Sequence, residues 1–144
     1  MFRVRICLLV ALVVVTTSVT SAEDYVVPTG VTVLTEEQLL NQIIGNTLEN
    51  GNGRWVEYFE PPTGDQKKGR FKGKSAASGR YDGSWEIKGN LMCWQHDEPH
   101  RIQSNKCFTT ALDGDTVTWY KTTGYPWYNP HPPIKLVSGN PKNL

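Results

Sequence analysis

Residues suited to metal chemistry gather in one short stretch of the chain: His96, Asp97, Glu98 and His100. Imidazole nitrogens and carboxylate oxygens are common ligands of zinc and other divalent ions. The spacing of these four residues matches no familiar ligand pattern, and Pro99 interrupts them. We therefore expect a solvent-exposed polar loop without a metal; a divalent-ion site held rigid by a nearby disulfide is the alternative.

Four carboxylates, Glu57, Glu60, Asp82 and Glu86, offer groups for general acid–base catalysis. They lie in segments that alternate between apolar and polar residues, so we expect them to face water. The chain has no Gly-x-Ser-x-Gly motif and no Ser–His–Asp or Cys–His set in a known catalytic pattern. These observations predict a protein that is not an enzyme and has no catalytic residues.

The segment Gly69–Ser75 (GRFKGKS) has the composition of a phosphate-binding loop. That motif needs four residues between its glycines and a helix after its lysine, whereas only Arg70, Phe71 and Lys72 separate Gly69 from Gly73 here, and no helical pattern follows. We expect a solvated basic strand, and the chain shows no other motif for a cofactor.

Aromatic residues are the better candidates for binding. Four tryptophans lie in predicted strands, at positions 55, 85, 94 and 119. Such rings usually fill the core of a small β-protein, but some line the mouth of a cavity and stack on a flat ligand. The candidate ligand-binding residues are Trp55, Tyr81, Trp85 and Trp119.

The fifth tryptophan, Trp127, lies in a segment of a different kind. It stands with Tyr125, Tyr128 and His131 among four prolines, which favour a stiff extended chain. Two interpretations remain open: a strap that seals the fold, or an edge that recognises a partner. Trp127 is therefore a candidate partner-binding residue.

The first 22 residues have the pattern of a cleaved secretory signal. Arg3 and Arg5 precede an apolar run over residues 6–15, and the small residues Thr20, Ser21 and Ala22 follow. The run is short for a membrane span, although an uncleaved anchor is the alternative. We expect a periplasmic or secreted protein that is not integrated in a membrane after cleavage.

The charge is almost balanced, with 15 Lys and Arg against 14 Asp and Glu, although the basic residues crowd residues 67–80. This balance does not indicate a nucleic-acid partner. Beyond the signal, Cys93 and Cys107 are the only cysteines, and in an oxidising compartment they are expected to pair. Closing a loop of about 15 residues contributes roughly 3 kcal/mol to stability.

One short helix is predicted near the start of the domain. Thr35 and Gln38 form a capping box, and Gly45 ends the helix. Its apolar residues, Leu39, Leu40, Ile43 and Ile44, form one stripe that we expect to pack against a sheet.

Residues 78–94 predict a β-hairpin. Tyr81, Gly83, Trp85 and Ile87 alternate with polar residues, and a turn follows at residues 88–90. We expect a three-residue connection, which sets Ile87 opposite Leu91 and Trp85 opposite Cys93.

Further strands are predicted at residues 45–50, 54–60, 67–74, 107–112, 116–121 and 134–137, with a polar loop over 95–105 and a turn at Asp113–Gly114. Seven or eight short strands at regular spacing indicate a mainly β fold, a small antiparallel up-and-down β-barrel with one N-terminal helix. Residues 34–144 form this single domain, and residues 23–33 form an exposed leader.

Residues 45–115 resemble a family of small exported bacterial proteins of unknown function, on the segments GNTLENGNGRWVEYFEPPTG, GKSAASGRYDGSWEIKGNLMCW and CFTTALDGDTVTWY. The resemblance implies export and a compact β-fold. Gly83-Ser84-Trp85 is also similar to the Gly-x-Trp of lipocalin and streptavidin-type barrels.

Ser78-Gly79-Arg80-Tyr81, followed by Lys88-Gly89, resembles a motif of the membrane-bound and periplasmic inhibitors of c-type lysozyme. That resemblance implies that Ser78 and Lys88 enter a lysozyme cleft. The leading hypothesis is an exported, non-enzymatic barrel that binds a small apolar or aromatic ligand or an envelope protein. Inhibition of a lysozyme-like hydrolase is the alternative.

Overall fold

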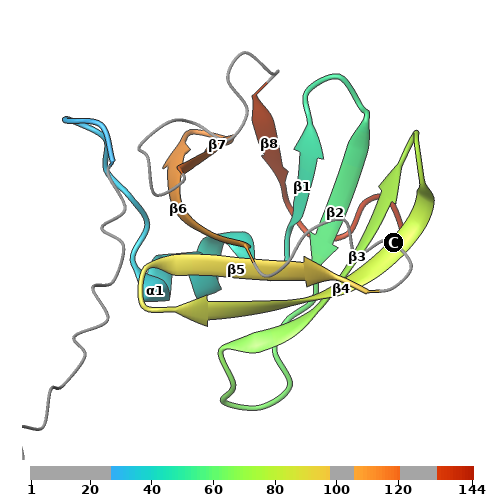
Figure 1. The fold of residues 1–144 in the computed structure, drawn as a ribbon, viewed down its shortest axis with the longest axis horizontal. Helices are drawn as coiled ribbons and strands as arrows, with labels where there is room; N and C mark the ends of the chain where they lie inside the picture. Colours follow the sequence, from blue (N-terminus) through green and yellow to red (C-terminus); the bar gives the residue numbers. More distant parts are fainter. Residues whose placement is uncertain (1–26, 98–105, 121–132) are drawn as a thin grey trace, which may run out of the picture.

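Eight antiparallel strands close into a barrel in a computed structural model of the protein, which describes residues 27–97, 106–120 and 133–144 (Figure 1). Each strand pairs with the next along the chain, and β8 pairs with β1 to close the barrel. This confirms the predicted up-and-down barrel. The strands are β1 (Thr47–Asn50), β2 (Trp55–Phe59), β3 (Lys68–Ser75), β4 (Gly79–Lys88), β5 (Leu91–His96), β6 (Lys106–Asp113), β7 (Thr116–Tyr120) and β8 (Ile134–Val137).

The predicted helix is present, and it begins as its capping residues indicate. α1 (Glu36–Gln38) continues as a short π-helical segment, η1 (Leu39–Ile43). The backbone N–H of Gln38 donates to the hydroxyl of Thr35, and the backbone N–H of Thr35 donates to the side-chain oxygen of Gln38. These two reciprocal bonds satisfy backbone donors that the first helical turn would otherwise leave unpaired.

The helix closes one end of the barrel, where β4 ends and β5 begins (Figure 1). Leu39 and Ile43 are fully buried there with the core. Gly45 ends the helix with a φ of 82°, and its N–H donates to the carbonyl of Phe59, the last residue of β2. We call this the helix end. The opposite end, where β2 and β4 begin and β5 stops, is the far end.

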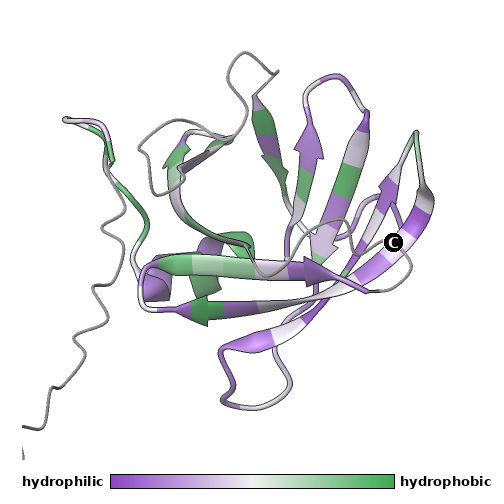
Figure 2. Cartoon of the chain, viewed as in Figure 1, coloured by the Kyte–Doolittle hydropathy of each residue, from purple (hydrophilic) through white to green (hydrophobic). Residues whose placement is uncertain are grey.

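The strands alternate between hydrophobic and hydrophilic residues, as a barrel wall requires (Figure 2). In β4 every second residue from Tyr81 to Ile87 is buried and the residues between are exposed. Between β3 and β4, each interior pair combines a glycine with an aromatic ring: Gly69 with Trp85, Phe71 with Gly83, and Gly73 with Tyr81. The bare backbone on one strand thus leaves room for the ring on the other.

The β4–β5 hairpin differs from the predicted register. Ile87 pairs with Met92 and Trp85 with Trp94, so the connection has two residues, Gly89 and Asn90, and not three. Gly89 has a φ of 59°, which a two-residue hairpin turn favours. The observed register keeps Ile87 and Met92 together in the core, whereas the predicted register would have turned Met92 outward.

The predicted disulfide between Cys93 and Cys107 is formed. The two residues are directly opposite one another on β5 and β6, on the face of β5 that points away from Met92 and Trp94. The bridge therefore ties the two strands together from outside the ring of interior side chains.

The predicted signal over residues 1–22 and the start of the leader lie outside the described residues. In the described part of the leader, Val27, Val31 and Val33 are half-buried and the other residues are exposed. The N–H of Leu34, which follows the leader, donates to the carbonyl of Thr110 on β6. Within the described ranges, no helix is long and apolar enough to cross a membrane.

Candidate functional site

Three polar side chains meet inside the barrel toward the far end: Glu57 of β2, Tyr81 of β4 and His96 of β5. The Tyr81 hydroxyl donates to Oε1 of Glu57 at 2.9 Å, and Nε2 of His96 lies 3.4 Å from the same oxygen. The Glu57 side chain is 7% exposed and that of His96 is 27% exposed. We call these residues the polar set. Among the described residues, the nearly buried Glu57 carboxylate has one charge partner, His96, which is positively charged only when protonated.

Glu57 faces the interior because of its place in β2. It alternates with Trp55 and Phe59 on one face of the strand, and it pairs with Gly73 of β3. Gly73 has no side chain to occupy the space between Glu57 and Tyr81, so the two meet. The prediction that Glu57 faces water was therefore wrong, although its alternation with Trp55 and Phe59 signalled the interior position.

The prediction of a polar loop was also wrong for His96. His96 is the last residue of β5, and its ring lies edge-on to Phe71 and Tyr81, with centroids 5.4 Å and 4.9 Å away. Glu98 and His100 lie outside the described residues. In the part of the chain that the structure describes, no three His, Cys, Asp or Glu residues gather to hold a metal ion.

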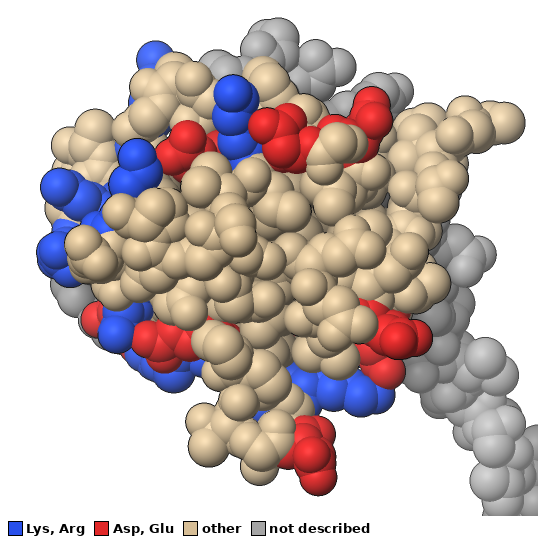
Figure 3. Space-filling view, turned by 180° about the vertical axis from the view of Figure 1, so that it is seen from behind, with Lys and Arg blue, Asp and Glu red and all other residues tan. Residues whose placement is uncertain are grey.

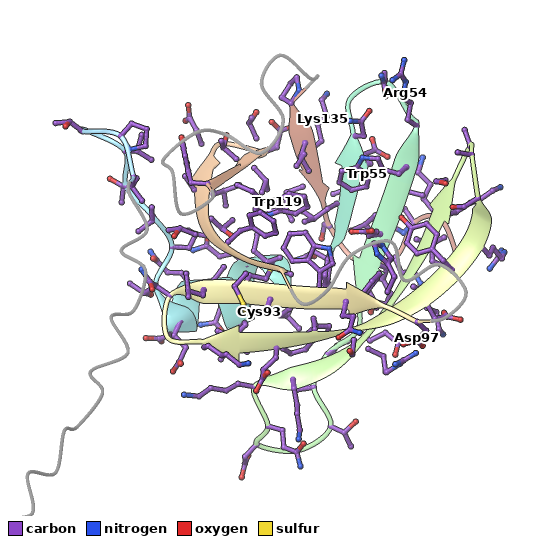
Figure 4. The ribbon with its side chains drawn as sticks, in the orientation of Figure 1. Arg54, Trp55, Cys93, Asp97, Trp119 and Lys135 are labelled. Carbon is purple, nitrogen blue, oxygen red and sulfur yellow. A yellow bond between two sulfur atoms is a disulfide. The ribbon has the colours of Figure 1, made fainter. Side chains whose placement is uncertain are left out.

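An aromatic wall of three tryptophans lies beside the polar set. Trp119 stacks on Trp55 with centroids 6.0 Å apart and planes inclined by 8°, and it meets Trp94 at 4.5 Å. Figure 4 shows Trp55 and Trp119 inside the ring of strands. Trp55 and Trp94 are half-buried, and each lies two residues from a member of the polar set, Glu57 or His96, on the same strand face.

The ligand-binding candidates therefore separate into two places. Trp55, Tyr81 and Trp119 lie together in the far half of the barrel, and Trp94, which the sequence reasoning did not single out, joins them. Trp85 is apart from this group. It is 1% exposed, and its indole N–H donates to the carbonyl of Glu60 near the helix end at 3.0 Å, so it is a core residue.

The two residues implied by the resemblance to lysozyme inhibitors are not brought together. Ser78 precedes β4 and Lys88 ends it, and a strand of 10 residues spans roughly 30 Å. Ser78 bonds to Ser75 in the β3–β4 turn, and Lys88 forms an ion pair with Glu86. They do not project from one rim. Trp127, the third partner-binding candidate, lies outside the described residues.

Basic residues are concentrated at one side of the molecule, toward the β3–β4 hairpin (Figure 3). Three of them are paired with carboxylates: Lys67 with Glu36, Arg70 with Asp97, and Lys72 with Glu60. Lys74 stands directly opposite Arg80, and both are exposed. Much of the positive charge of residues 67–80 is therefore neutralised locally.

The ion pair next to the polar set involves Arg70 and Asp97. Arg70 donates from both terminal nitrogens to the two carboxylate oxygens of Asp97. The hydrogen bond from Arg70 lowers the pKa of Asp97 below its ordinary value, and the same bond raises the pKa of Arg70. Asp97 directly follows His96, so this pair anchors the end of β5 to β3 on the outer surface.

Replacing Asp97 with asparagine is expected to lower stability near pH 7 by less than about 1 kcal/mol, because both partners are half exposed, at 51% and 46%. A carboxyl whose pKa is lower in the folded state stabilises above its unfolded pKa and loses that contribution as the pH falls through the folded value. The difference between wild type and Asp97→Asn, measured by urea unfolding, should therefore shrink as the pH is lowered below the ordinary pKa of an aspartate. Asp65→Asn, in an exposed turn, is the control and should show no such pH-dependent difference.

Comparison of the chain with protein-family models, with curated proteins and with solved structures finds no match.

Proposed function

We propose that the protein is an exported, non-enzymatic binding protein that holds a small apolar or aromatic ligand at the far end of its barrel. The observation that carries this proposal is the placement of the aromatic wall and the polar set on the same interior surface, at the end that the helix does not cover. Small-molecule sites are mostly apolar and carry a few polar groups that orient the ligand. Three indole rings beside one carboxylate, one phenol and one imidazole have this composition.

The exposure of these side chains supports a site at the far end and not at the helix end. Trp55, Trp94 and His96 are half-buried although their strand positions face the interior. At the helix end the interior is filled by fully buried residues such as Leu39 and Ile43. A planar ligand that stacks on the wall gains aromatic contact with Trp55 and Trp94 and removes their exposed surface from water.

Two observations support export. Residues 1–22 have the charge and hydropathy pattern of a secretory signal, and the disulfide belongs to proteins of oxidising compartments. Placement in the periplasm or outside the cell follows from this pattern and is part of the proposal.

Native mass spectrometry of gently purified protein tests the binding function. We expect a reproducible mass excess over the denatured chain, and we expect Trp55→Ala to lose it. Tyr58→Ala is the matched control because Tyr58 lies on the outward-facing positions of the same strand, so this variant should keep the excess. The denatured mass also reports whether the chain begins after Ala22.

If wild type shows its bare mass, and if small aromatic compounds at millimolar concentration also leave its tryptophan fluorescence unchanged, the proposed function is wrong. An excess that survives in Trp55→Ala would place the bound molecule away from the aromatic wall and would contradict the proposed site.

A further inference from the structure

Glu57 has acceptor capacity that the described residues do not use. The residue is 5% exposed, and its contacts with Tyr81 and His96 both end on Oε1. No described residue donates a hydrogen bond to Oε2. An ionised carboxylate can accept about four hydrogen bonds on its two oxygens, and leaving them unmade in a buried place is unfavourable.

Among the described residues, no lysine or arginine compensates the charge of Glu57 inside the barrel. Every Lys and Arg whose side chain the structure describes is exposed. The residues that face Glu57 from neighbouring strands are Leu48 of β1, Gly73 of β3, Tyr81 of β4 and His96 of β5. Of these, only His96 can carry a positive charge. A buried carboxylate of this kind favours a cation over a neutral or anionic group.

The surrounding rings favour the same chemistry. Tyr81 and the aromatic wall present π-electron surfaces, and a cation near the face of Trp or Tyr is attracted by the negative charge of that face. A carboxylate together with aromatic rings is the combination that recognises organic ammonium groups. From these contacts we infer that the ligand carries a protonated amine, which donates to Oε2 of Glu57 while its apolar body packs on the aromatic wall. This inference rests on the proposed binding function.

Three probes with the same ring and different charge test the inference: 2-phenylethylamine, 2-phenylethanol and phenylacetate. Their dissociation constants are measured at neutral pH from the shifts of the tryptophan indole N–H signals in NMR titrations. A charge-assisted hydrogen bond is stronger than a neutral one. We therefore expect the amine to bind at least about tenfold more tightly than the alcohol, and the carboxylate to bind most weakly.

Glu57→Gln identifies the residue responsible. Glutamine keeps the length of the side chain and an acceptor for the Tyr81 hydroxyl but removes the negative charge. We expect the amine to bind this variant no more tightly than the alcohol, whose affinity should change little. Glu86→Gln, on the exposed face of β4, is the control and should keep the wild-type preference. The ranking of the three probes on wild type tests the inference even if Glu57→Gln does not fold.

The outcomes separate the inference from the function on which it rests. If the alcohol binds as tightly as the amine, or if Glu57→Gln leaves the preference for the amine intact, the amine inference is overturned and the binding function stands. If none of the three probes moves an indole signal, the amine inference is overturned, and the binding function is overturned with it when native mass spectrometry of the wild type also shows no mass excess.

Discussion

Replacing Gly83 with alanine is expected to lower the free energy of unfolding by about 3 kcal/mol or to prevent folding. An added Cβ at this position would lie 2.2 Å from Cε1 of Phe71 and 2.3 Å from the backbone carbonyl oxygen of Gln95. Real Cβ atoms do not approach other atoms so closely, and the carbonyl belongs to β5, which pairs with β4 at this point. Both the ring and a neighbouring strand would have to move.

Gly73→Ala is a second variant whose stability can be compared with that of Gly83→Ala. Its Cβ would lie 2.2 Å from Cε2 of Tyr81, but its three nearest neighbours are all atoms of that ring and not of the backbone. A side chain can move more easily than a backbone strand. We therefore expect Gly73→Ala to lower the free energy of unfolding by less than Gly83→Ala does. Because Tyr81 holds Glu57, Gly73→Ala should also weaken amine binding.

Chemical unfolding, followed by tryptophan fluorescence, measures the free energies of unfolding of Gly83→Ala and Gly73→Ala. Ser84→Ala, one residue from Gly83 on the exposed face of β4, is the matched control and should stay within about 0.5 kcal/mol of wild type. If Gly83→Ala unfolded at the same denaturant concentration as Ser84→Ala, the close packing of Phe71 on the β4 backbone would be contradicted.

These glycines also show what the sequence alone could not predict. The alternation of Tyr81, Gly83, Trp85 and Ile87 was sufficient to predict a strand and its buried face, because that pattern is local. The role of Gly69 and Gly73 was not predictable in the same way. On β3 these glycines lie among basic residues. Their role is to leave room for the aromatic rings of β4 that lie opposite them, and those rings are distant in sequence.

The wrong register of the β4–β5 hairpin has a similar cause. Gly89 and Asn90 suit a tight turn in either register, so the turn residues did not decide between a two-residue and a three-residue connection. The choice depends on which residue of β5 lies opposite Ile87, and Leu91 and Met92 are both apolar enough for that position. Contacts distant in sequence decide in favour of Met92.

Two members of the polar set, Glu57 and His96, were missed because the local preference of each residue type disagrees with its position in the barrel. A glutamate in a strand usually faces water, and a histidine followed by Asp97, Glu98 and Pro99 resembles a loop. The barrel nevertheless places Glu57 and His96 inside, since β2 and β5 keep their alternation through these residues. Positions where a sequence departs from local rules are often functional, which agrees with the site that we propose.

Loss of the disulfide is expected to be the second large effect. The bond joins Cys93 and Cys107, which are 14 residues apart, and a loop of this size restricts the unfolded chain enough to contribute about 3 kcal/mol. Cys93 is 3% exposed, so Cys93→Ala with Cys107→Ala also removes buried volume. We therefore expect the double variant to be somewhat less stable than reduced wild type, and both to be clearly less stable than the oxidised protein.

Urea unfolding of these three forms separates the two contributions. Release of the cross-link should increase the dependence of the unfolding free energy on urea concentration, because the unfolded chain then exposes more surface. A comparable midpoint for reduced and oxidised wild type would contradict a stabilising role for the bond. Trp94 and His96 follow Cys93 closely on β5, and Phe108 follows Cys107 on β6. If the bond also positions the far end, its loss should weaken binding of 2-phenylethylamine under conditions where the barrel is still folded.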